Sequence, residues 1–74
     1  MENEVLTCSQ IAEELGISRQ QVLNYIKFGV EIEDRVLKLP ARMMSGAYRV
    51  FRKDLDNFLY TYYKATIFFK YFKM

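Results

Sequence analysis

Amide and guanidinium side chains gather in one short stretch of the chain. Residues 19–24 read Arg-Gln-Gln-Val-Leu-Asn, and Lys27 follows three positions later. A glutamine or asparagine amide can form two hydrogen bonds with the edge of an adenine, and an arginine can do the same with a guanine. An ordinary solvated helix face has a similar composition, so the stretch by itself supports either interpretation. To read bases, these side chains must lie on one face of a rigid element.

The inventory of reactive side chains argues against an enzyme. The 74 residues include no histidine and one cysteine, Cys8. Without histidine the commonest general base and zinc ligand is missing, and a single cysteine permits no internal disulfide or cysteine-based metal cage. The acids lie at expected helix starts or in one group, and no pair has a spacing that suggests a shared catalytic site. We predict no enzyme activity, no cofactor and no metal, and we expect Cys8 in the core.

Basic residues are concentrated in the middle of the chain, although the formal net charge is only +2. Residues 35–53 contain bases and no acids, whereas residues 31–34 contain three acids. The bases in question are Arg35, Lys38, Arg42, Arg49, Arg52 and Lys53. A local positive field of this kind attracts phosphate backbones. A solvated face with its counter-charges folded nearby is the alternative.

Two short helices are predicted in the first third of the chain. A Thr-x-x-Gln capping box at residues 7–10, followed by apolar residues on one face, predicts a helix over 8–15 that ends at Gly16. A Ser-x-x-Gln box at residues 18–21 starts a second helix over 19–28. The link of about three residues between them predicts a helix-turn-helix, with the start of the second helix projecting outward.

The rest of the chain predicts a hairpin and a third helix. Residues 35–39 and 48–51 are rich in β-branched and aromatic residues and are expected to pair, with residues 41–47 as a loose basic tip. Acids then begin an amphipathic helix that runs from about Lys53 to Tyr63. The expected fold class is mainly α with a small β-hairpin: three helices and two strands.

The length allows one domain over residues 1–74, with a core over about 5–63 and an aromatic C-terminal extension over 64–74. The first residues are acidic, unlike a signal peptide, and no apolar run approaches the roughly 20 residues of a membrane span. We expect a soluble cytoplasmic protein that does not contact membranes. The extension contains more aromatic residues than this small fold easily buries, so we expect either a long third helix across the domain or self-association.

Several motifs occur in a specific order over about residues 5–60. They are Leu-Thr-Cys-Ser-Gln-Ile-Ala at 6–12, Leu-Gly-Ile-Ser-Arg at 15–19, Leu-Pro-Ala at 39–41, Tyr-Arg-Val at 48–50 and Lys-Asp-Leu-Asp-Asn-Phe-Leu at 53–59. Together they resemble the excisionase-like, MerR-related DNA-binding domains. The chain differs from that pattern in a longer and more acidic segment at 30–35 and in its aromatic tail after Tyr60.

The resemblance implies a winged helix-turn-helix whose second helix enters the major groove of double-stranded DNA while the hairpin, or wing, contacts the minor groove or backbone. It implies an excisionase-type recombination directionality factor of a mobile element, with a tyrosine integrase as partner. The implied location is the cytoplasm of a prokaryote, at the nucleoid, for a protein of prokaryotic or phage origin. A small helix-turn-helix transcriptional regulator is the alternative. A protein-interaction module that uses the aromatic tail is a further alternative.

Two sets of DNA-binding residues are expected. For the major-groove helix they are Ser18, Arg19, Gln20, Gln21, Asn24 and Lys27. For the wing and the DNA backbone they are Lys38, Arg42, Arg49, Arg52 and Lys53.

Overall fold

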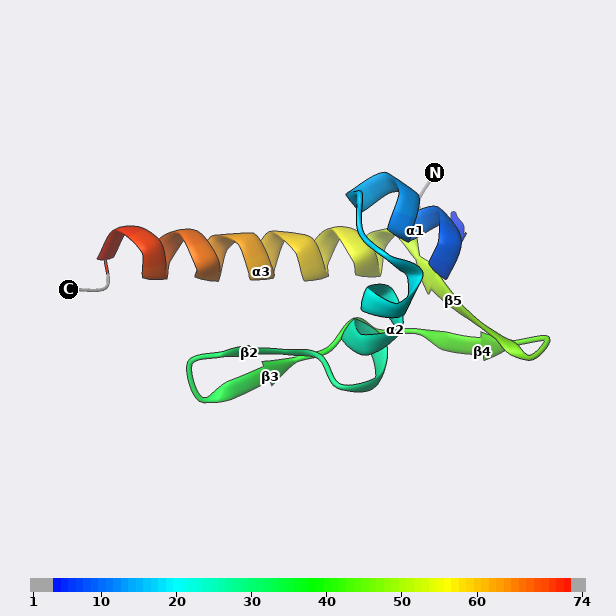
Figure 1. Cartoon of the computed structure of the whole chain (residues 1–74). Helices are drawn as coiled ribbons and strands as arrows, with labels where there is room; N and C mark the ends of the chain where they lie inside the picture. Colours follow the sequence, from blue (N-terminus) through cyan, green and yellow to red (C-terminus); the bar gives the residue numbers. More distant parts are fainter. Residues whose placement is uncertain (1–3, 73–74) are drawn as a thin grey trace.

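Three helices, a three-stranded antiparallel sheet and a separate two-stranded hairpin make up residues 4–72 (Figure 1). The structure is a computed structural model that describes these residues, and it describes side chains for residues 4–64. The elements follow the order β1 (Val5–Thr7), α1 (Cys8–Leu15), α2 (Arg19–Lys27), β2 (Val30–Ile32), β3 (Arg35–Leu37), β4 (Arg42–Met44), β5 (Ala47–Phe51) and α3 (Arg52–Phe72). The three predicted helices are confirmed, but the fold is mixed α/β because it contains more strand than expected.

The capping motifs position the first two helices. The Thr7 hydroxyl accepts a hydrogen bond from the Gln10 backbone N–H (3.1 Å), and the Gln10 side-chain oxygen accepts one from the Thr7 N–H (2.8 Å). Gly16 has a φ of +70° and ends α1 in the left-handed conformation that glycine adopts without strain. The Ser18 hydroxyl then caps α2 by accepting from the Gln21 N–H (3.1 Å). These local bonds fix the end of α1, the tight turn and the start of α2.

The three-stranded sheet has the order β1-β5-β4, so β5 lies in the centre. Leu6 on β1 lies opposite Val50 on β5, and both side chains are buried. Because successive side chains on a strand point to opposite faces, the neighbouring row carries Thr7, Arg49 and Arg42, one from each strand. The sheet therefore has an apolar face toward the core and a face that carries two arginines.

The predicted pairing of residues 35–39 with residues 48–51 is wrong. β3 pairs with β2, and β5 pairs with β1 and β4. Glu33 has a positive φ of 57° in the tight turn between β2 and β3, so the acidic group that precedes Arg35 forms a turn. Leu39 is only 1% exposed, and its N–H donates to the Tyr25 carbonyl (3.1 Å). The chain therefore enters the core directly after β3 and does not continue beside β5.

The predicted loose tip at residues 41–47 is instead an ordered hairpin. β4 and β5 are joined by Ser45 and Gly46, which both have positive φ (51° and 78°). Two-residue turns of this kind match the natural twist of the strands. The Ser-Gly turn signal is confirmed, while Arg42 lies on a strand and not at the tip of the hairpin.

α3 begins one residue before its predicted start and continues beyond its predicted end near Tyr63. Phe58 is buried, whereas Tyr60 and Tyr63 are exposed, as the excess of aromatic residues in this region predicted. Figure 1 shows α3 extending well past the sheet. The side chains of Ile67, Phe68, Tyr71 and Phe72, which the self-association hypothesis also used, lie outside the described part of the chain.

The core lies where α1, α2 and the start of α3 meet the inner face of the sheet. Its buried members are Leu6, Cys8, Ile11, Ala12, Val22, Leu39, Val50, Leu55 and Phe58. The rings of Tyr25 and Tyr62 extend the core, with centroids 5.3 and 5.9 Å from that of Phe58. Tyr48 and Phe51 on β5 are half-buried. In the region described, no helix is both long enough and apolar enough to span a membrane.

Candidate nucleic-acid interface

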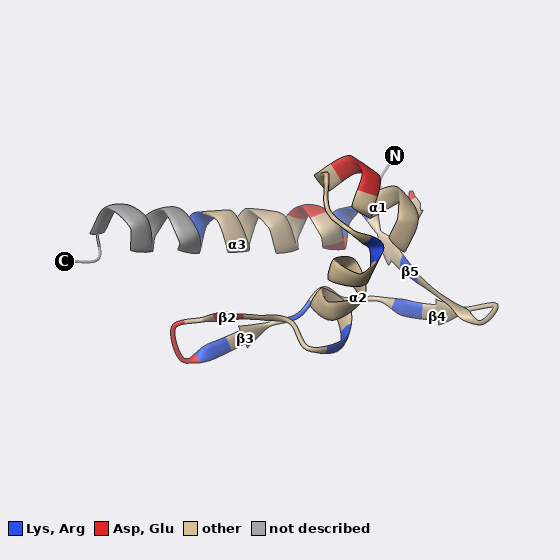
Figure 2. Ribbon diagram, viewed as in Figure 1, with Lys and Arg blue, Asp and Glu red and all other residues tan. Residues whose placement is uncertain are grey.

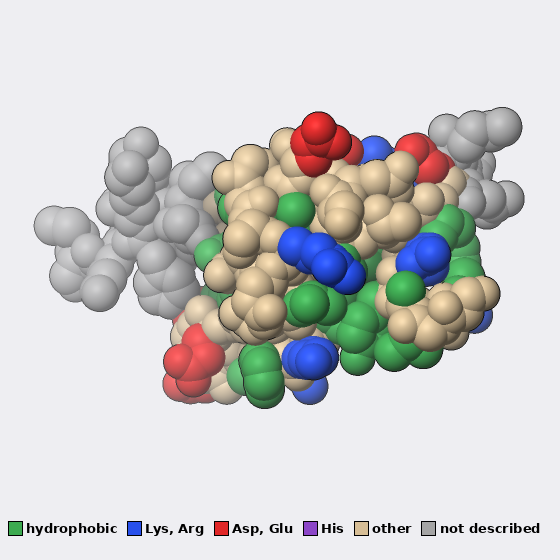
Figure 3. Space-filling model, turned by 45° about the vertical axis from the view of Figure 1, so that its right-hand side comes forward, with side chains coloured by type: hydrophobic (Ala, Val, Ile, Leu, Met, Phe, Trp, Pro, Cys, Tyr) green, Lys and Arg blue, Asp and Glu red, His purple; other side chains and the backbone are tan. Residues whose placement is uncertain are grey.

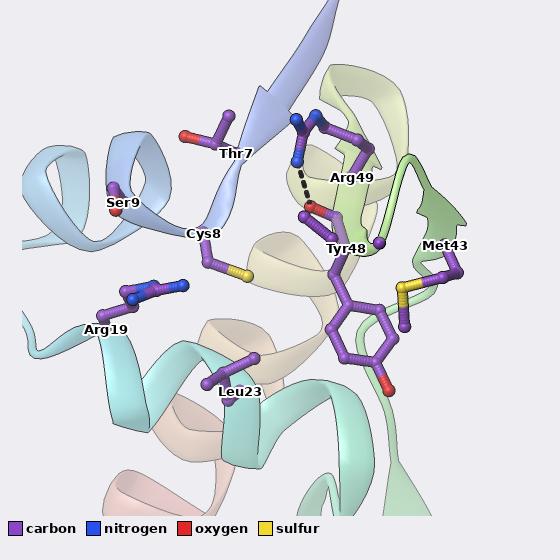
Figure 4. A pocket seen from close by; sticks show the side chains of 10 residues that line it. Thr7, Cys8, Ser9, Arg19, Leu23, Met43, Tyr48 and Arg49 are labelled. Atoms are coloured by element: carbon purple, nitrogen blue, oxygen red, sulfur yellow. Dashed lines mark hydrogen bonds between the residues drawn. The ribbon is translucent and has the colours of Figure 1, made fainter.

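A hollow of about 190 Å³ lies between the start of α1, α2 and the β4–β5 hairpin. Its lining residues are Thr7, Cys8, Ser9, Arg19, Leu23, Met43, Gly46, Ala47, Tyr48 and Arg49. Figure 4 shows the Cys8 sulfur above Leu23 and the Tyr48 ring to the right of Leu23. Arg19 from α2 and Arg49 from β5 thus lie on the rim of the same hollow, although they come from opposite halves of the chain.

Both rim arginines are close enough to act on the thiol that lines the hollow. Burial raises the pKa of Cys8, and the positive charges of Arg19 and Arg49 oppose this increase without cancelling it. The thiol therefore stays protonated at neutral pH and acts as a small apolar side chain. The hollow therefore carries the positive charges of Arg19 and Arg49 at its border and an uncharged Cys8 thiol inside it.

The two arginines of the β4–β5 hairpin form a pair across the strands. Arg42 lies directly opposite Arg49 in the register of the two strands. Arg49 is half-buried and donates to the Tyr48 carbonyl (3.1 Å; dashed line in Figure 4). Arg42 is exposed, with its guanidinium carbon 5.5 Å from the centre of the Phe51 ring. Contacts with neutral groups hold both side chains, and no carboxylate of the described residues forms an ion pair with either guanidinium.

The amide face of α2 is also ordered. The Gln20 side-chain nitrogen donates to the Asn24 side-chain oxygen at 3.1 Å, one helical turn further on. Gln20 is exposed and Asn24 is half-buried, so neither side chain is in the core. Gln20 directly follows Arg19 in the sequence, so the amide pair lies on the adjacent side of α2 from the lining residues Arg19 and Leu23.

The remaining residues expected in the major groove lie at the two ends of α2. The Ser18 oxygen accepts from the Gln21 N–H, so its hydroxyl proton is still available to an acceptor outside the protein. Gln21 is half-buried, and Lys27 is exposed in the last turn of the helix. Lys38 and Lys53, expected at the DNA backbone, are exposed just after β3 and in the first turn of α3.

Arg52 has a different role from the one that the sequence predicted. Its guanidinium donates to both carboxylate oxygens of Glu14 (2.7 and 3.0 Å), and the carboxylates of Glu4 and Asp56 lie 3.5 and 3.8 Å away. These bonds lower the pKa of Glu14 below its usual range, and the three carboxylates raise that of Arg52 further. Arg52 is therefore engaged within the protein, and we remove it from the expected set of phosphate-binding residues.

Acidic and basic residues are partly separated on the surface. Acids lie at the turn between β2 and β3, at the C-terminal part of α1 and on α3, and bases lie on β4, β5 and both ends of α2, while both kinds adjoin at the start of β3 and of α3 (Figure 2). With the β4–β5 hairpin turned forward, basic side chains spread over the face shown, and acidic side chains lie at its upper border and lower left (Figure 3). One face of the molecule is thus suited to a polyanion.

Sequence reasoning missed three residues at this face. Met43 and Tyr48 line the hollow from the hairpin. Phe28, directly after α2, is 69% exposed. The spacing of Phe28 in the sequence was the signal that could have identified it. Phe28 follows Asn24 by four positions, as Asn24 follows Gln20, and residues at this spacing lie on one side of a helix.

No protein-family model matches the chain, and no curated protein and no solved structure matches it either. We therefore infer the function from the side chains themselves. Within the described residues, no group of three or more His, Cys, Asp or Glu side chains could hold a metal ion.

Proposed function

We propose that this chain is a sequence-specific double-stranded DNA-binding protein with a winged helix-turn-helix fold. In this proposal α2 enters the major groove, and the β4–β5 hairpin is the wing that contacts the flanking backbone or minor groove. The acidic β2–β3 hairpin is an additional element between the helix-turn-helix and the wing. The protein performs no bond-breaking chemistry.

The observation that carries the proposal is the hollow that Arg19 and Arg49 share. Arg19 at the start of α2 and Arg49 on β5 both line it, which supports a DNA-binding surface that combines α2 with the β4–β5 hairpin. The hydrogen-bonded amide pair of Gln20 and Asn24 lies on the same helix as Arg19, with Gln20 exposed and Asn24 half-buried. A positive rim beside an ordered amide face suits DNA, because charges bind phosphates and amides discriminate bases.

Within this class, we propose an excisionase-type recombination directionality factor with a tyrosine integrase as partner, as the family resemblance over residues 5–60 implies. A transcriptional regulator is the alternative, because it would need the same fold and the same face. Footprinting on the attachment region and on nearby promoters separates the two roles. Protection confined to the attachment region supports excision, and protection confined to a promoter supports regulation.

The experiment that tests DNA binding is a salt titration. The purified protein selects duplexes from a random pool, and fluorescence anisotropy then measures the affinity at several salt concentrations. We expect a logarithmic slope of roughly −3 to −5, since each neutralised phosphate contributes about −0.9. No duplex binding, or an affinity that does not change with salt, would contradict the proposal.

A second candidate function is a protein-interaction module that uses α3. The exposed rings of Tyr60 and Tyr63 favour it, because exposed aromatic residues are common at protein interfaces. This candidate predicts self-association or partner binding that tolerates salt. Light scattering at high protein concentration tests for self-association, and a monomeric mass would exclude it.

A further inference from the structure

Phe28 extends the amide face of α2 by one more turn. It has helical backbone angles (φ −113°, ψ −27°), and its N–H donates to the Asn24 carbonyl at 2.8 Å. Its side chain is therefore positioned by the helix itself. At 3.6 residues per turn, each step of four residues rotates by about 40°, so Gln20, Asn24 and Phe28 follow one another along the same side of the helix.

The Phe28 ring is the most exposed large apolar side chain in the described part of the protein, at 69%. Lys27 precedes Phe28 in the sequence, and the following residue, Gly29, lies against the aliphatic part of the Lys38 side chain, 2.9 Å from where a methyl group on Gly29 would be. Both lysines are exposed. An exposed apolar ring in a segment that two lysines adjoin suits a ligand that combines negative charge with an apolar group.

The major groove of DNA offers that combination. Phosphates line the groove, and each thymine projects a 5-methyl group into it. The same A·T base pair presents adenine N6 and N7 to an amide and the thymine methyl group to an apolar side chain. The order of Gln20, Asn24 and Phe28 places both kinds of contact on successive turns of one helix.

We infer that Phe28 determines sequence specificity by contacting the 5-methyl group of thymine in the major groove. This inference rests on the DNA binding proposed above. It adds that α2 recognises a base pair that contains thymine. It gives Phe28 a contact in the complex that it does not have in the free protein.

The test compares thymine with uracil, which differs only in lacking the methyl group. A duplex selected from a random pool by the unmodified protein is resynthesised with deoxyuridine in place of each thymidine in turn. At one or two positions we expect affinity to fall about fourfold per methyl group, the equivalent of one buried methylene. Anisotropy at fixed salt measures this difference.

Two variants connect the methyl effect to the side chain. Phe28→Ala should bind the thymine and uracil duplexes equally, and Phe28→Leu should keep part of the difference. The matched control is Tyr60→Ala, which removes an equally exposed ring (67%) from α3 and should leave the discrimination unchanged. Circular dichroism verifies that the variants are folded. The uracil scan of the unmodified protein tests the inference even if a variant does not fold.

The outcomes separate the inference from the proposed function. Salt-dependent duplex binding with no uracil effect, or a uracil effect that persists in Phe28→Ala, overturns the inference and leaves the proposed function intact. A change in oligomeric state of Phe28→Ala without any change in uracil discrimination also overturns it. If no duplex binds at all, both fail.

Discussion

The Arg52 guanidinium contacts both carboxylate oxygens of Glu14 and thereby joins the start of α3 to the C-terminal part of α1. Two parallel hydrogen bonds between an arginine and a carboxylate fix orientation as well as distance. The side chain of Arg52 is only 25% exposed, compared with 43% for Glu14. This contact makes Arg52 a structural residue near the end of a run of bases in which Arg35, Lys38, Arg42 and Lys53 are exposed.

Arg52 and its neighbour Lys53 should therefore respond differently to truncation. Arg52→Ala should lower the melting temperature and leave the salt slope of DNA binding unchanged, because this guanidinium is already bound by carboxylates. Lys53→Ala should leave the melting temperature unchanged and reduce the salt slope by about one unit, if it meets a phosphate. Thermal unfolding and salt titrations measure the two effects. The same response from both variants would show that the assignment is wrong.

The Glu14 contact should also make stability depend on pH. Because the folded state lowers the pKa of Glu14, the contact stabilises the protein fully above the unfolded pKa of glutamate. This contribution is lost as the pH falls through the lower folded pKa. Urea unfolding between pH 7 and pH 3 should therefore show a stability difference between the unmodified protein and Glu14→Gln that shrinks toward acid pH. Glu13→Gln, on the same helix, is the control. A difference that is constant with pH would contradict the pairing.

Gly29 should tolerate alanine less well than Gly46. Both have nearly the same positive φ (77° and 78°), which costs about 1–2 kcal/mol for a residue with a side chain. At Gly29 an added methyl group would also come within 2.6 Å of the Leu37 carbonyl oxygen, whereas nothing lies within 4 Å at Gly46. Gly29→Ala should therefore lower the free energy of unfolding clearly more than Gly46→Ala, as measured in urea. Equal losses would mean that the contact with β3 is unimportant.

Substitutions on α2 and on the hairpin should have different consequences for DNA binding. Arg42→Ala should weaken binding to all sequences alike, because a phosphate or groove contact contains little base information. Asn24→Ala should relax the preference at one base position by about 1–3 kcal/mol. Competition with duplexes altered at single positions measures both effects. A uniform loss of affinity in both variants would mean that α2 does not read bases.

The sequence could predict the elements that local contacts determine, and it predicted the others poorly. The helix starts at Thr7 and Ser18 depend on bonds that span three residues, so capping motifs located them. Strand pairing depends on distant partners. The composition of residues 35–39 suggested a partner for residues 48–51, whereas in the structure residues 42–44, expected in the tip, pair with β5 and Leu39 is buried in the core.

The candidate interface shows the same limit. The amide face of α2 follows from helical spacing, so the amino-acid sequence alone predicts it. The role of Arg52 does not follow from spacing, since its partner Glu14 lies 38 positions away in the sequence. The proximity of Arg19 and Arg49 likewise depends on how the sheet packs against the helices, and no local pattern in the chain records it.

β4 forms one border of the three-stranded sheet, and all three of its residues are exposed. A strand in this position has backbone groups that another chain could pair with, which is how many proteins aggregate. Here the strand is short, and Arg42 and Arg49 stand side by side across the ladder, so a second copy approaching along that border meets two like charges. The same guanidiniums that suit a polyanion therefore also oppose pairing between the β4 strands of two molecules at high protein concentration.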